Sequence, residues 1–417
     1  MFDYEADQLQ CERVPLARVA AEVGTPTYVY SLAALRAAYH AYDRALADVP
    51  HLVCYAIKAN DTLAVIRAFA REGSGFDIVS GGELVRALRA GADPKRIVFA
   101  GVGKQQDEME AALQAGILMF NVESAAELEV LAQVAERLGK RAPVAIRVNP
   151  DVDPKTHPYI STGLKKSKFG VAIRVARELY AKAAALPAIE VIGVDCHIGS
   201  QLTSLEPFVD AWARIRALVG DLRAAGHTIR YVDLGGGLGI TYGDERPPAP
   251  TEYGKAVADA ARGLDVTVLV EPGRSLVGNA GVLLTRVLYM KGGGSKTFVV
   301  VDAAMNDLIR PSLYEAYHAI RPVAHPGGDT VIAVDVVGPV CESGDFIAQD
   351  RALPPLAAGD LLAVMSAGAY GFVMASNYNA RPRPAIVMVD GERYDVVRTR
   401  ETIGDLLRGE TIPGSLD

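Results

Sequence analysis

Short apolar segments recur between residues 52 and 270, and each has the length and composition of a buried strand. Alanine- and leucine-rich segments with the spacing of amphipathic helices lie among them. We predict strands at 52–57, 76–79, 97–100, 118–122, 144–148, 191–196, 231–234 and 266–270. We predict helices at 31–46, 82–90, 104–115, 125–138, 171–185 and 207–225. Strands that alternate with helices over about 250 residues are typical of a (β/α)8 barrel of the TIM type.

An open, doubly wound parallel sheet is the alternative fold for the same alternation. The barrel is favoured because the number of predicted strands is the number that closes it. From about residue 276 the pattern changes to strand-like runs rich in β-branched residues, separated by Gly, Pro and Asp turns. These runs are 282–290, 297–301, 330–337, 361–365 and 385–389. We therefore expect a barrel at 27–275, followed by an all-β domain at 276–417 that also takes in residues 1–26.

Composition narrows the functional classes. The chain has 417 residues, of which 50% are hydrophobic and 22% charged, as in ordinary globular proteins. Its net charge of -7 argues against a nucleic-acid or anionic-membrane partner. No apolar run approaches the roughly 20 residues of a membrane span.

Two further features bear on the cellular compartment. The first ten residues, MFDYEADQLQ, lack the basic and apolar regions of a signal peptide. The cysteines at 11, 54, 196 and 341 are scattered and form no CxxC pair, which argues against a disulfide framework and a structural zinc site. We expect a cytoplasmic protein.

Polar and glycine-rich segments cluster directly after the predicted strands. They are Lys58, 80–83, 121–124, 147–150, 197–200, 235–237 and 271–274. In a barrel all of these lie on the C-terminal face, where barrel enzymes hold their active sites. The shared position of all these segments is stronger evidence for an active site than any single motif.

Lys58 ends the apolar run VCYAI, so its amine has an apolar base. Burial disfavours the ammonium form and frees the lone pair that a Schiff-base lysine needs. The alternative is a lysine whose amine simply reaches the surface. The polar residues at the other strand ends favour the functional interpretation.

Three other strand ends carry candidate chemistry. Gly235, Gly236 and Gly237 could form a phosphate cradle or only a tight turn. Glu271 could hold a protonated ring nitrogen and Arg274 a phosphate or carboxylate, or the two could form an internal ion pair. His197 could stack on a flat ring or act in proton transfer.

In the β domain, Cys341 is followed by Glu342, Ser343, Gly344 and Asp345. The two neighbouring acids disfavour the thiolate, so the thiol stays protonated and could donate a proton. The alternative is an inert buried cysteine.

A lysine, a carboxylate for a ring nitrogen, a ring-stacking histidine and a glycine-rich phosphate loop together indicate a site for pyridoxal 5′-phosphate. The motifs YAIKAN, FDIVSGGE, HPYISTGLKKSKFG, CHIGSQ, DLGGGLGI, EPGRSLVG, CESGDF and GAYGFVMASNYN resemble those of the diaminopimelate decarboxylase family. The resemblance covers nearly the whole chain in order. The wider class of pyridoxal-phosphate decarboxylases is indicated by YAIKAN, HIGSQ and EPGR alone. The diaminopimelate branch is indicated by HPYISTG…KFG, CESGD and SNYN.

The resemblance implies a role for each matching residue. Lys58 carries the Schiff base, His197 stacks on the ring, Glu271 pairs with the pyridine nitrogen, and Asp77 and Arg147 support them. The phosphate is held by Ser200, Gly236, Gly237, Gly273, Arg274 and Tyr370. The substrate is bound by Arg274, Arg310, Tyr314, Glu342 and Tyr370. Cys341 is the proton donor. The chain matches the family pattern at each position.

The implied reaction is the decarboxylation of meso-2,6-diaminopimelate at its D-centre to L-lysine and carbon dioxide, the last step of lysine biosynthesis. The resemblance also implies a homodimer in which Cys341 and Glu342 reach the site across the interface. It implies no metal.

Four alternatives remain open from the sequence. A decarboxylase of ornithine, arginine or carboxynorspermidine has no second carboxylate clamp or a different one, so Arg310 and Tyr314 favour a dicarboxylic substrate. An alanine-type racemase would not show CESGD, and a non-enzymatic vitamin B6-binding protein would be a lone barrel. A metal-dependent barrel hydrolase would need a carboxylate–histidine cluster with ligand spacing, which the sequence does not show.

Overall fold

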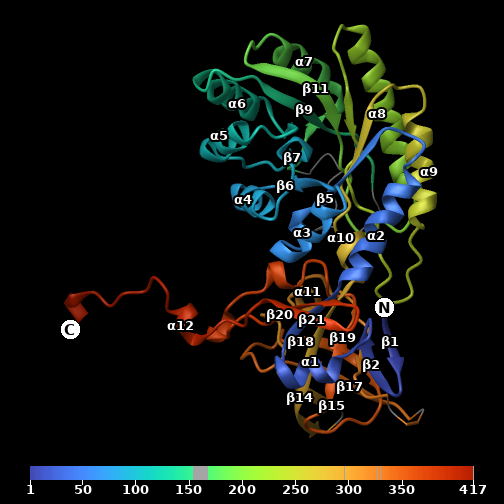
Figure 1. Ribbon diagram of the computed structural model, residues 1–417, viewed down its shortest axis with the longest axis vertical. Coiled ribbons are helices and arrows are strands. Elements are labelled where there is room, and N and C mark those ends of the chain that lie inside the picture. Colours follow the sequence, from blue (N-terminus) through green and yellow to red (C-terminus); the bar gives the residue numbers. More distant parts are fainter. Residues whose placement is uncertain (154–167, 295, 326, 329, 417) are drawn as a thin grey trace. The chain divides into compact units, whose positions relative to one another are not determined.

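The computed structural model (Figure 1) describes residues 1–416 except 154–167, 295, 326 and 329. The chain divides into two compact units. One is the barrel unit, Leu35–Val277, and the other is the β unit, which combines Met1–Ala34 with Gly278–Asp417. Each unit is described by itself below.

Eight parallel strands form the barrel unit, and each pairs with the next. The barrel closes where β13 pairs with β5, which rules out the open sheet. The strands are β5 (His51–Ala56), β6 (Gly75–Ile78), β7 (Ile97–Phe99), β8 (Met119–Val122), β9 (Ala142–Asn149), β11 (Ile189–Asp195), β12 (Tyr231–Asp233) and β13 (Thr267–Val270). All eight predicted strands are thereby confirmed. A short extra strand, β10 (Val171–Ala172), pairs with β9.

Helices follow most of these strands and surround the barrel (Figure 1). They are α2 (Leu32–Ala45), α3 (Leu63–Arg71), α4 (Gly81–Arg89), α5 (Gln106–Ala115), α6 (Ala125–Arg137), α7 (Ile173–Ala184), α8 (Glu206–Ala224), α9 (Pro250–Ala261) and α10 (Arg274–Val277). Two of them begin at serine caps, where Ser80 Oγ accepts the Glu83 N–H and Ser124 Oγ accepts the Glu127 N–H. These caps start a helix within a few residues of a strand end, so they keep the connecting loops short.

Apolar side chains fill the barrel interior. Leu52, Cys54, Val98, Met119, Ala145, Ile192 and Leu269 form one buried cluster. These residues come from six of the eight strands, so the interior is a packed core rather than a channel. The strands read as nearly continuous apolar runs because both faces of the barrel sheet are covered.

The β unit contains two sheets. The larger has the order β18-β17-β15-β14-β4-β20-β21, and β19 pairs with both β14 and β16. Its strands are β4 (Thr27–Ser31), β14 (Gly281–Gly293), β15 (Lys296–Val301), β16 (Ile320–Pro322), β17 (Ile332–Val337), β18 (Phe346–Leu353), β19 (Leu361–Val364), β20 (Ala385–Asp390) and β21 (Arg393–Arg398). The smaller sheet comprises β1 (Phe2–Glu5), β2 (Gln8–Cys11) and β3 (Val14–Pro15). Short helices are α1 (Leu16–Glu22), α11 (Arg310–Tyr314) and α12 (Ile403–Leu406).

Strand β4 lies in the β unit, although the sequence led us to begin the barrel at residue 27. It pairs antiparallel with β14, so that Tyr28 faces Leu283, and parallel with β20. All five of its residues are buried. A central strand with sheet partners on both sides belongs to that sheet, so the chain leaves the β unit only after β4.

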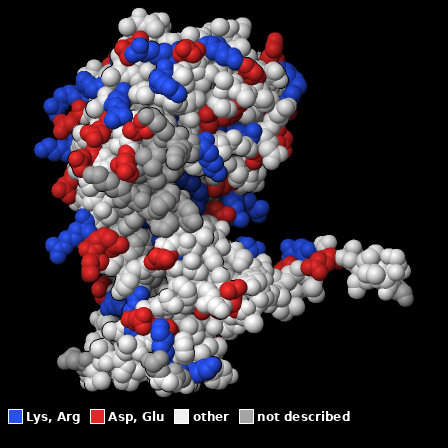
Figure 2. All heavy atoms as spheres, turned by 180° about the vertical axis from the view of Figure 1, so that it is seen from behind, with Lys and Arg blue, Asp and Glu red and all other residues white. Residues whose placement is uncertain are grey.

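Charged side chains of both signs are mixed over the face of the barrel unit seen in Figure 2. Many of them form exposed ion pairs, such as Arg230 Nη2 with Glu190 Oε1 at 2.7 Å. Such pairs contribute roughly 0–1 kcal/mol each. Among the described residues, no helix combines the length and the apolar character needed to cross a membrane.

Candidate active site

Lys58 lies directly after β5 in a short 3₁₀ turn, and its Nζ is hydrogen-bonded to Asp77 Oδ2. Asp77 lies on the neighbouring strand β6 and is fully buried, whereas the Lys58 side chain is 34% exposed. The sequence led us to expect an amine held among apolar groups. The structure instead places a buried carboxylate beside it, which neutralises the charge of the ammonium and fixes the position of Nζ.

His197 follows β11, and its Nδ1 accepts a hydrogen bond of 3.0 Å from the Gly236 backbone N–H. Desolvation within the barrel lowers the pKa of His197 well below its usual range, and the charges of Arg147 and Lys58 add to this effect. The ring is therefore neutral, with its proton on Nε2. A neutral, flat side chain in this position suits stacking on an aromatic ring.

Glycines are required where the loops after β11, β12 and β13 meet. A Cβ on Gly236 would lie 2.0 Å from the Glu271 carbonyl oxygen. Gly237 has a φ of +117°, and its Cβ would lie 2.4 Å from the Gly199 carbonyl oxygen. Only glycine allows backbones to approach this closely, which is the property that a backbone phosphate cradle uses.

Arg274 is buried and held by two hydroxyl groups. Its Nη1 donates to the Tyr242 hydroxyl at 2.5 Å, and its Nη2 donates to Ser200 Oγ at 3.0 Å. The Tyr242 ring also lies under the guanidinium, at 5.7 Å from its centroid. Tyr242 was missed from the sequence. The signal available was an aromatic residue five positions after Gly237.

A second buried arginine supports the site from β9. Arg147 Nη1 forms an ion pair of 2.8 Å with Glu123 Oε1. Glu123 also accepts the Gly101 N–H at 3.1 Å and the Gly170 N–H at 2.7 Å. The Glu123 carboxylate thus holds Arg147 and the backbones at Gly101 and Gly170 at the same time. The sequence placed both residues at strand ends but did not predict their pairing.

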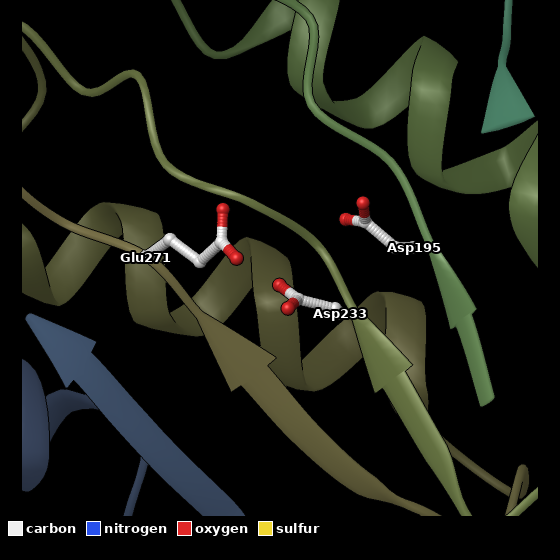
Figure 3. A group of neighbouring side chains, drawn as sticks. All are labelled: Asp195, Asp233 and Glu271. Carbon is white, nitrogen blue, oxygen red and sulfur yellow. The ribbon is translucent and has the colours of Figure 1, made fainter. Parts of the chain in front are cut away.

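Three buried carboxyl groups meet beneath this end of the barrel. Asp195 and Asp233 end β11 and β12, Glu271 directly follows the neighbouring β13, and Figure 3 shows their carboxyl groups turned toward one another. One oxygen of each lies within 4.8 Å of the others. Asp195 and Asp233 were missed from the sequence, because a single aspartate at a strand end carries no distinctive local signal.

The other predicted site residues belong to the β unit. Arg310 is buried in α11, and its Nε donates to His318 Nε2 at 3.4 Å, with the Tyr314 ring centroid 5.8 Å from the guanidinium. Tyr370 adopts a positive φ of 55°. Cys341 and Glu342 are exposed.

Hydrogen bonds hold the backbone of the loop that carries Cys341 and Glu342. Asp345 accepts backbone N–H bonds from Val340 at 2.6 Å and Met305 at 2.7 Å. The Cys341 N–H donates to Asn379 Oδ1 at 2.8 Å. This CESGD loop therefore presents its thiol and carboxylate from a fixed backbone. Most of the predicted HPYISTG…KFG motif lies outside the described residues.

The barrel residues fit pyridoxal 5′-phosphate. Glu271 is 6% exposed, and its Oε1 has no hydrogen-bond partner among the described residues, as required of an acceptor waiting for a ring N–H. The glycine contacts described above leave no room for side chains where backbone N–H groups would meet a phosphate. Lys58, at the mouth of the same barrel, supplies the amine.

Comparison with known proteins agrees with this site. The family profile described as "Pyridoxal-dependent decarboxylase, pyridoxal binding domain" matches residues 32–278. Diaminopimelate decarboxylase of Pseudomonas aeruginosa is 58% identical over 411 residues, covering 99% of both chains. The enzyme of Vibrio cholerae is 54% identical over 413 residues, again covering 99% of both.

Solved structures of diaminopimelate decarboxylases are also similar to this chain. The structure of diaminopimelate decarboxylase from M. jannaschii is 38% identical with a TM-score of 0.95, over 99% of this chain and 98% of that one. The enzyme of Helicobacter pylori, complexed with L-lysine, is 44% identical with a TM-score of 0.91, over 94% of this chain and 98% of that one. This chain therefore belongs to the diaminopimelate decarboxylase family of pyridoxal-dependent decarboxylases.

Proposed function

We propose that this chain is a carboxy-lyase that removes carbon dioxide from the D-centre of meso-2,6-diaminopimelate and releases L-lysine, the last step of lysine biosynthesis. The observation that carries the proposal is the convergence of Lys58, His197, Glu271 and Arg274 at one end of a closed barrel. Full-length similarity to enzymes named for this reaction supports it.

Pyridoxal 5′-phosphate, when bound, accepts the electron pair of the breaking bond between the α-carbon and the carboxylate. Lys58 is the residue that would attach it, and Asp77 holds Nζ in place. Glu271 would accept the ring N–H through its unpartnered Oε1. His197 would stack on the ring as a neutral imidazole.

The phosphate would be held where loops after three strands converge. The residues proposed for this role are Ser200, Gly236, Gly237, Gly273, Arg274 and Tyr370. In support, a Cβ on Gly273 would lie 3.1 Å from the Ala59 Cβ, so this backbone packs directly against the turn that carries Lys58. Ser200 is already tied to Arg274, so the two would act together.

Substrate recognition needs a carboxylate clamp and an amine acceptor. We assign the carboxylate at the non-reacting end to Arg274, Arg310 and Tyr314, with help from Tyr370, and the distal amine to Glu342. Guanidinium groups bind carboxylates in bidentate geometry, and the Tyr314 ring beside Arg310 limits the orientations of the fork.

After carbon dioxide leaves, the α-carbon needs a proton. We assign its donor to the Cys341 thiol, which loses the proton as the new C–H bond forms. The fixed backbone of the CESGD loop supports this role, because proton transfer requires a donor at a defined distance.

We further propose a two-domain homodimer that supplies Cys341 and Glu342 across its interface. The exposure of both residues within their own unit is compatible with that arrangement. We place the enzyme in the cytoplasm, since its four cysteines are free and three are buried, which suits a reducing compartment. The net charge of -7 speaks against a nucleic-acid or anionic-membrane partner.

Product analysis tests the proposal directly. Purified protein loaded with pyridoxal 5′-phosphate is given meso-diaminopimelate, ornithine and arginine in parallel, and products are identified by mass spectrometry. Lysine from the first substrate alone is the expected result. Putrescine or agmatine as the main product would keep the cofactor chemistry but overturn the assignment of Arg310 and Tyr314.

A further inference from the structure

The carboxyl groups of Asp195, Asp233 and Glu271 form a buried acid cluster that the mechanism above uses only in part. The three side chains are 1%, 0% and 6% exposed. They converge from the ends of β11, β12 and β13 (Figure 3). Only Glu271 has a proposed contact with the cofactor, so the roles of the two aspartates need an explanation.

The cations near the cluster are already paired. Lys58 is bonded to Asp77, and Arg147 forms its ion pair with Glu123. Among the described residues, no ion pair links a cation to a member of the cluster. The other titratable groups that face it are uncharged at neutral pH: Cys54, Cys196, His197, Tyr180 and Tyr253. Three unpaired carboxylates in one buried site would be very costly, so protons must reduce the charge.

Hydrogen bonds show where a proton resides. Asp233 Oδ1 accepts the Gly235 N–H at 3.0 Å, and its Oδ2 accepts the Asn121 amide at 3.2 Å. One carboxyl oxygen of Glu271 lies within 4.8 Å of one of Asp233. Two buried carboxyl groups this close do not both ionise, so one of them holds a proton. Since Asp233 already accepts two donors, the proton belongs on Glu271.

The electrostatic surroundings agree with this placement. Burial raises the pKa of Glu271 well above its usual range, and the neighbouring Asp233 and Asp77 raise it further. Burial likewise raises the pKa of Asp233 to about 7. Burial also raises the pKa of Asp195 well above its usual range. The cofactor-free cluster therefore keeps a proton near neutral pH.

We propose that Asp233 positions a proton on Glu271 in the cofactor-free enzyme, and that this proton leaves Glu271 when a protonated ring nitrogen binds. This inference rests on the proposed contact between Glu271 and the ring. Before binding, Glu271 is a carboxylic acid that donates to the Asp233 carboxylate. After binding, Glu271 is a carboxylate that accepts the ring N–H.

The protons balance whether or not the cofactor arrives with a proton on its ring nitrogen. If the cofactor arrives with an unprotonated ring nitrogen, that nitrogen takes the proton of Glu271. If it arrives protonated, the proton of Glu271 passes to solvent. The loaded state is the same in both cases, so the number of protons exchanged with solvent reports the protonation of the empty cluster.

The test counts protons during cofactor binding. Pyridoxal 5′-phosphate is titrated into the cofactor-free full chain at pH 8, where Asp233 is ionised, by calorimetry in buffers of different ionisation enthalpy. Removing the charge of Asp233 lowers the pKa of Glu271, so a larger share of Glu271 is ionised before binding in the Asp233→Asn variant. Cofactor binding to this variant should therefore release fewer protons per site than binding to the wild type. An unchanged proton count in a variant that still binds would overturn the proposal.

Asp307→Asn is the matched control. Asp307 lies in the β unit, and burial raises its pKa to about 7, as for Asp233. Its replacement should leave the proton count of cofactor binding unchanged. A change equal to that of Asp233→Asn would mean that the effect is not specific to the cluster, and would overturn the proposal.

Infrared difference spectra of the wild type provide a second readout if Asp233→Asn fails to fold. The carbonyl band of a protonated carboxylic acid should disappear when the cofactor binds, and Glu271→Gln should lack this change. An empty enzyme without the band would refute the inference. Lysine formation by the wild type, measured separately, would show that the proposed function survives that outcome.

Discussion

The Nδ1 atom of His197 accepts a hydrogen bond of 3.0 Å from the backbone N–H of Gly236. This bond joins the loop after β11 to the loop after β12 and selects the tautomer with the proton on Nε2. It therefore links a proposed ring-stacking residue to the proposed phosphate loop, so that either can be perturbed through the other.

The first prediction concerns the charge of His197. Because burial and two nearby cations lower its pKa well below its usual range, the ring should stay neutral at pH values where an ordinary histidine is protonated. Nuclear magnetic resonance of histidine-labelled protein, with the signal assigned by its loss in His197→Gln, measures this. A His197 signal that titrates near pH 6.5 would contradict the neutral ring.

The same shift has a consequence for stability. Below about pH 6.5 the unfolded chain binds a proton at His197 that the folded chain does not. The contribution of His197 to the free energy of unfolding is therefore present above that pH and falls as the pH drops, by at most about 1.4 kcal/mol per pH unit. Denaturant unfolding from pH 5 to 8 should show a weaker slope in His197→Gln than in the wild type.

The second prediction compares two glycines. In Gly236→Ala the new Cβ meets a carbonyl oxygen at 2.0 Å, so the backbone must shift and cofactor affinity should fall at least about a hundredfold. Gly220 lies exposed in α8, where an added Cβ would meet no neighbouring atom within 4 Å, and Gly220→Ala should stabilise the fold by about 0.5–1 kcal/mol. Fluorescence titration with pyridoxal 5′-phosphate and denaturant unfolding distinguish the two effects.

The third prediction concerns the lysine. Lys58→Ala should lower kcat at least about a thousandfold. It should also remove the visible absorption of the covalently attached cofactor. Lys58→Arg should also be inactive, but it keeps a cation beside Asp77 and so should unfold at the wild-type temperature. Normal turnover in either variant would refute the whole site.

The fourth prediction concerns the support of Arg274. Tyr242→Phe removes the hydroxyl that accepts from Nη1 and keeps the ring under the guanidinium. Losing a hydrogen bond to a charged group costs about 1.5–3 kcal/mol, so the KM for diaminopimelate should rise about tenfold or more while kcat changes less. Steady-state kinetics provide the measurement. A fall in kcat at constant KM would argue that Arg274 does not bind the substrate.

The fifth prediction concerns assembly. Lys58→Ala and Cys341→Ala should each be inactive alone. If Cys341 is supplied across a dimer interface, mixing and re-assembling the two variants should restore about a quarter of the wild-type activity, because random exchange creates one intact site in half of the dimers. No recovery, despite exchange shown by native mass spectrometry, would place both groups in one chain.

Local sequence determined much of the fold. The eight barrel strands are mostly apolar runs, and each could be recognised because burial on both faces leaves few polar positions to break the run. Helices α3 and α9 were missed; α9 follows a loop rich in proline, which hides its start. The position of Lys58 at a strand end was also readable from its neighbours alone.

Other features depend on partners far away in the chain. Strand β4 is fully buried, as several barrel strands are, and only its pairing with β14 and β20 assigns it to the β unit. Tyr242 becomes a site residue only because Arg274 reaches its hydroxyl. Side-chain contacts of this kind are absent from any local pattern.

The acid cluster shows most clearly the difference between what the local sequence predicts and what the tertiary structure decides. The sequence by itself determined that the chain alternates strands with helices and that polar groups follow the strands. Only the pairing of β11, β12 and β13 in the folded barrel brings Asp195, Asp233 and Glu271 into one buried site. The physical reason is that periodicity reports whether a residue faces water or the core, whereas the pKa of a buried acid depends on which other charges lie within a few ångströms of it.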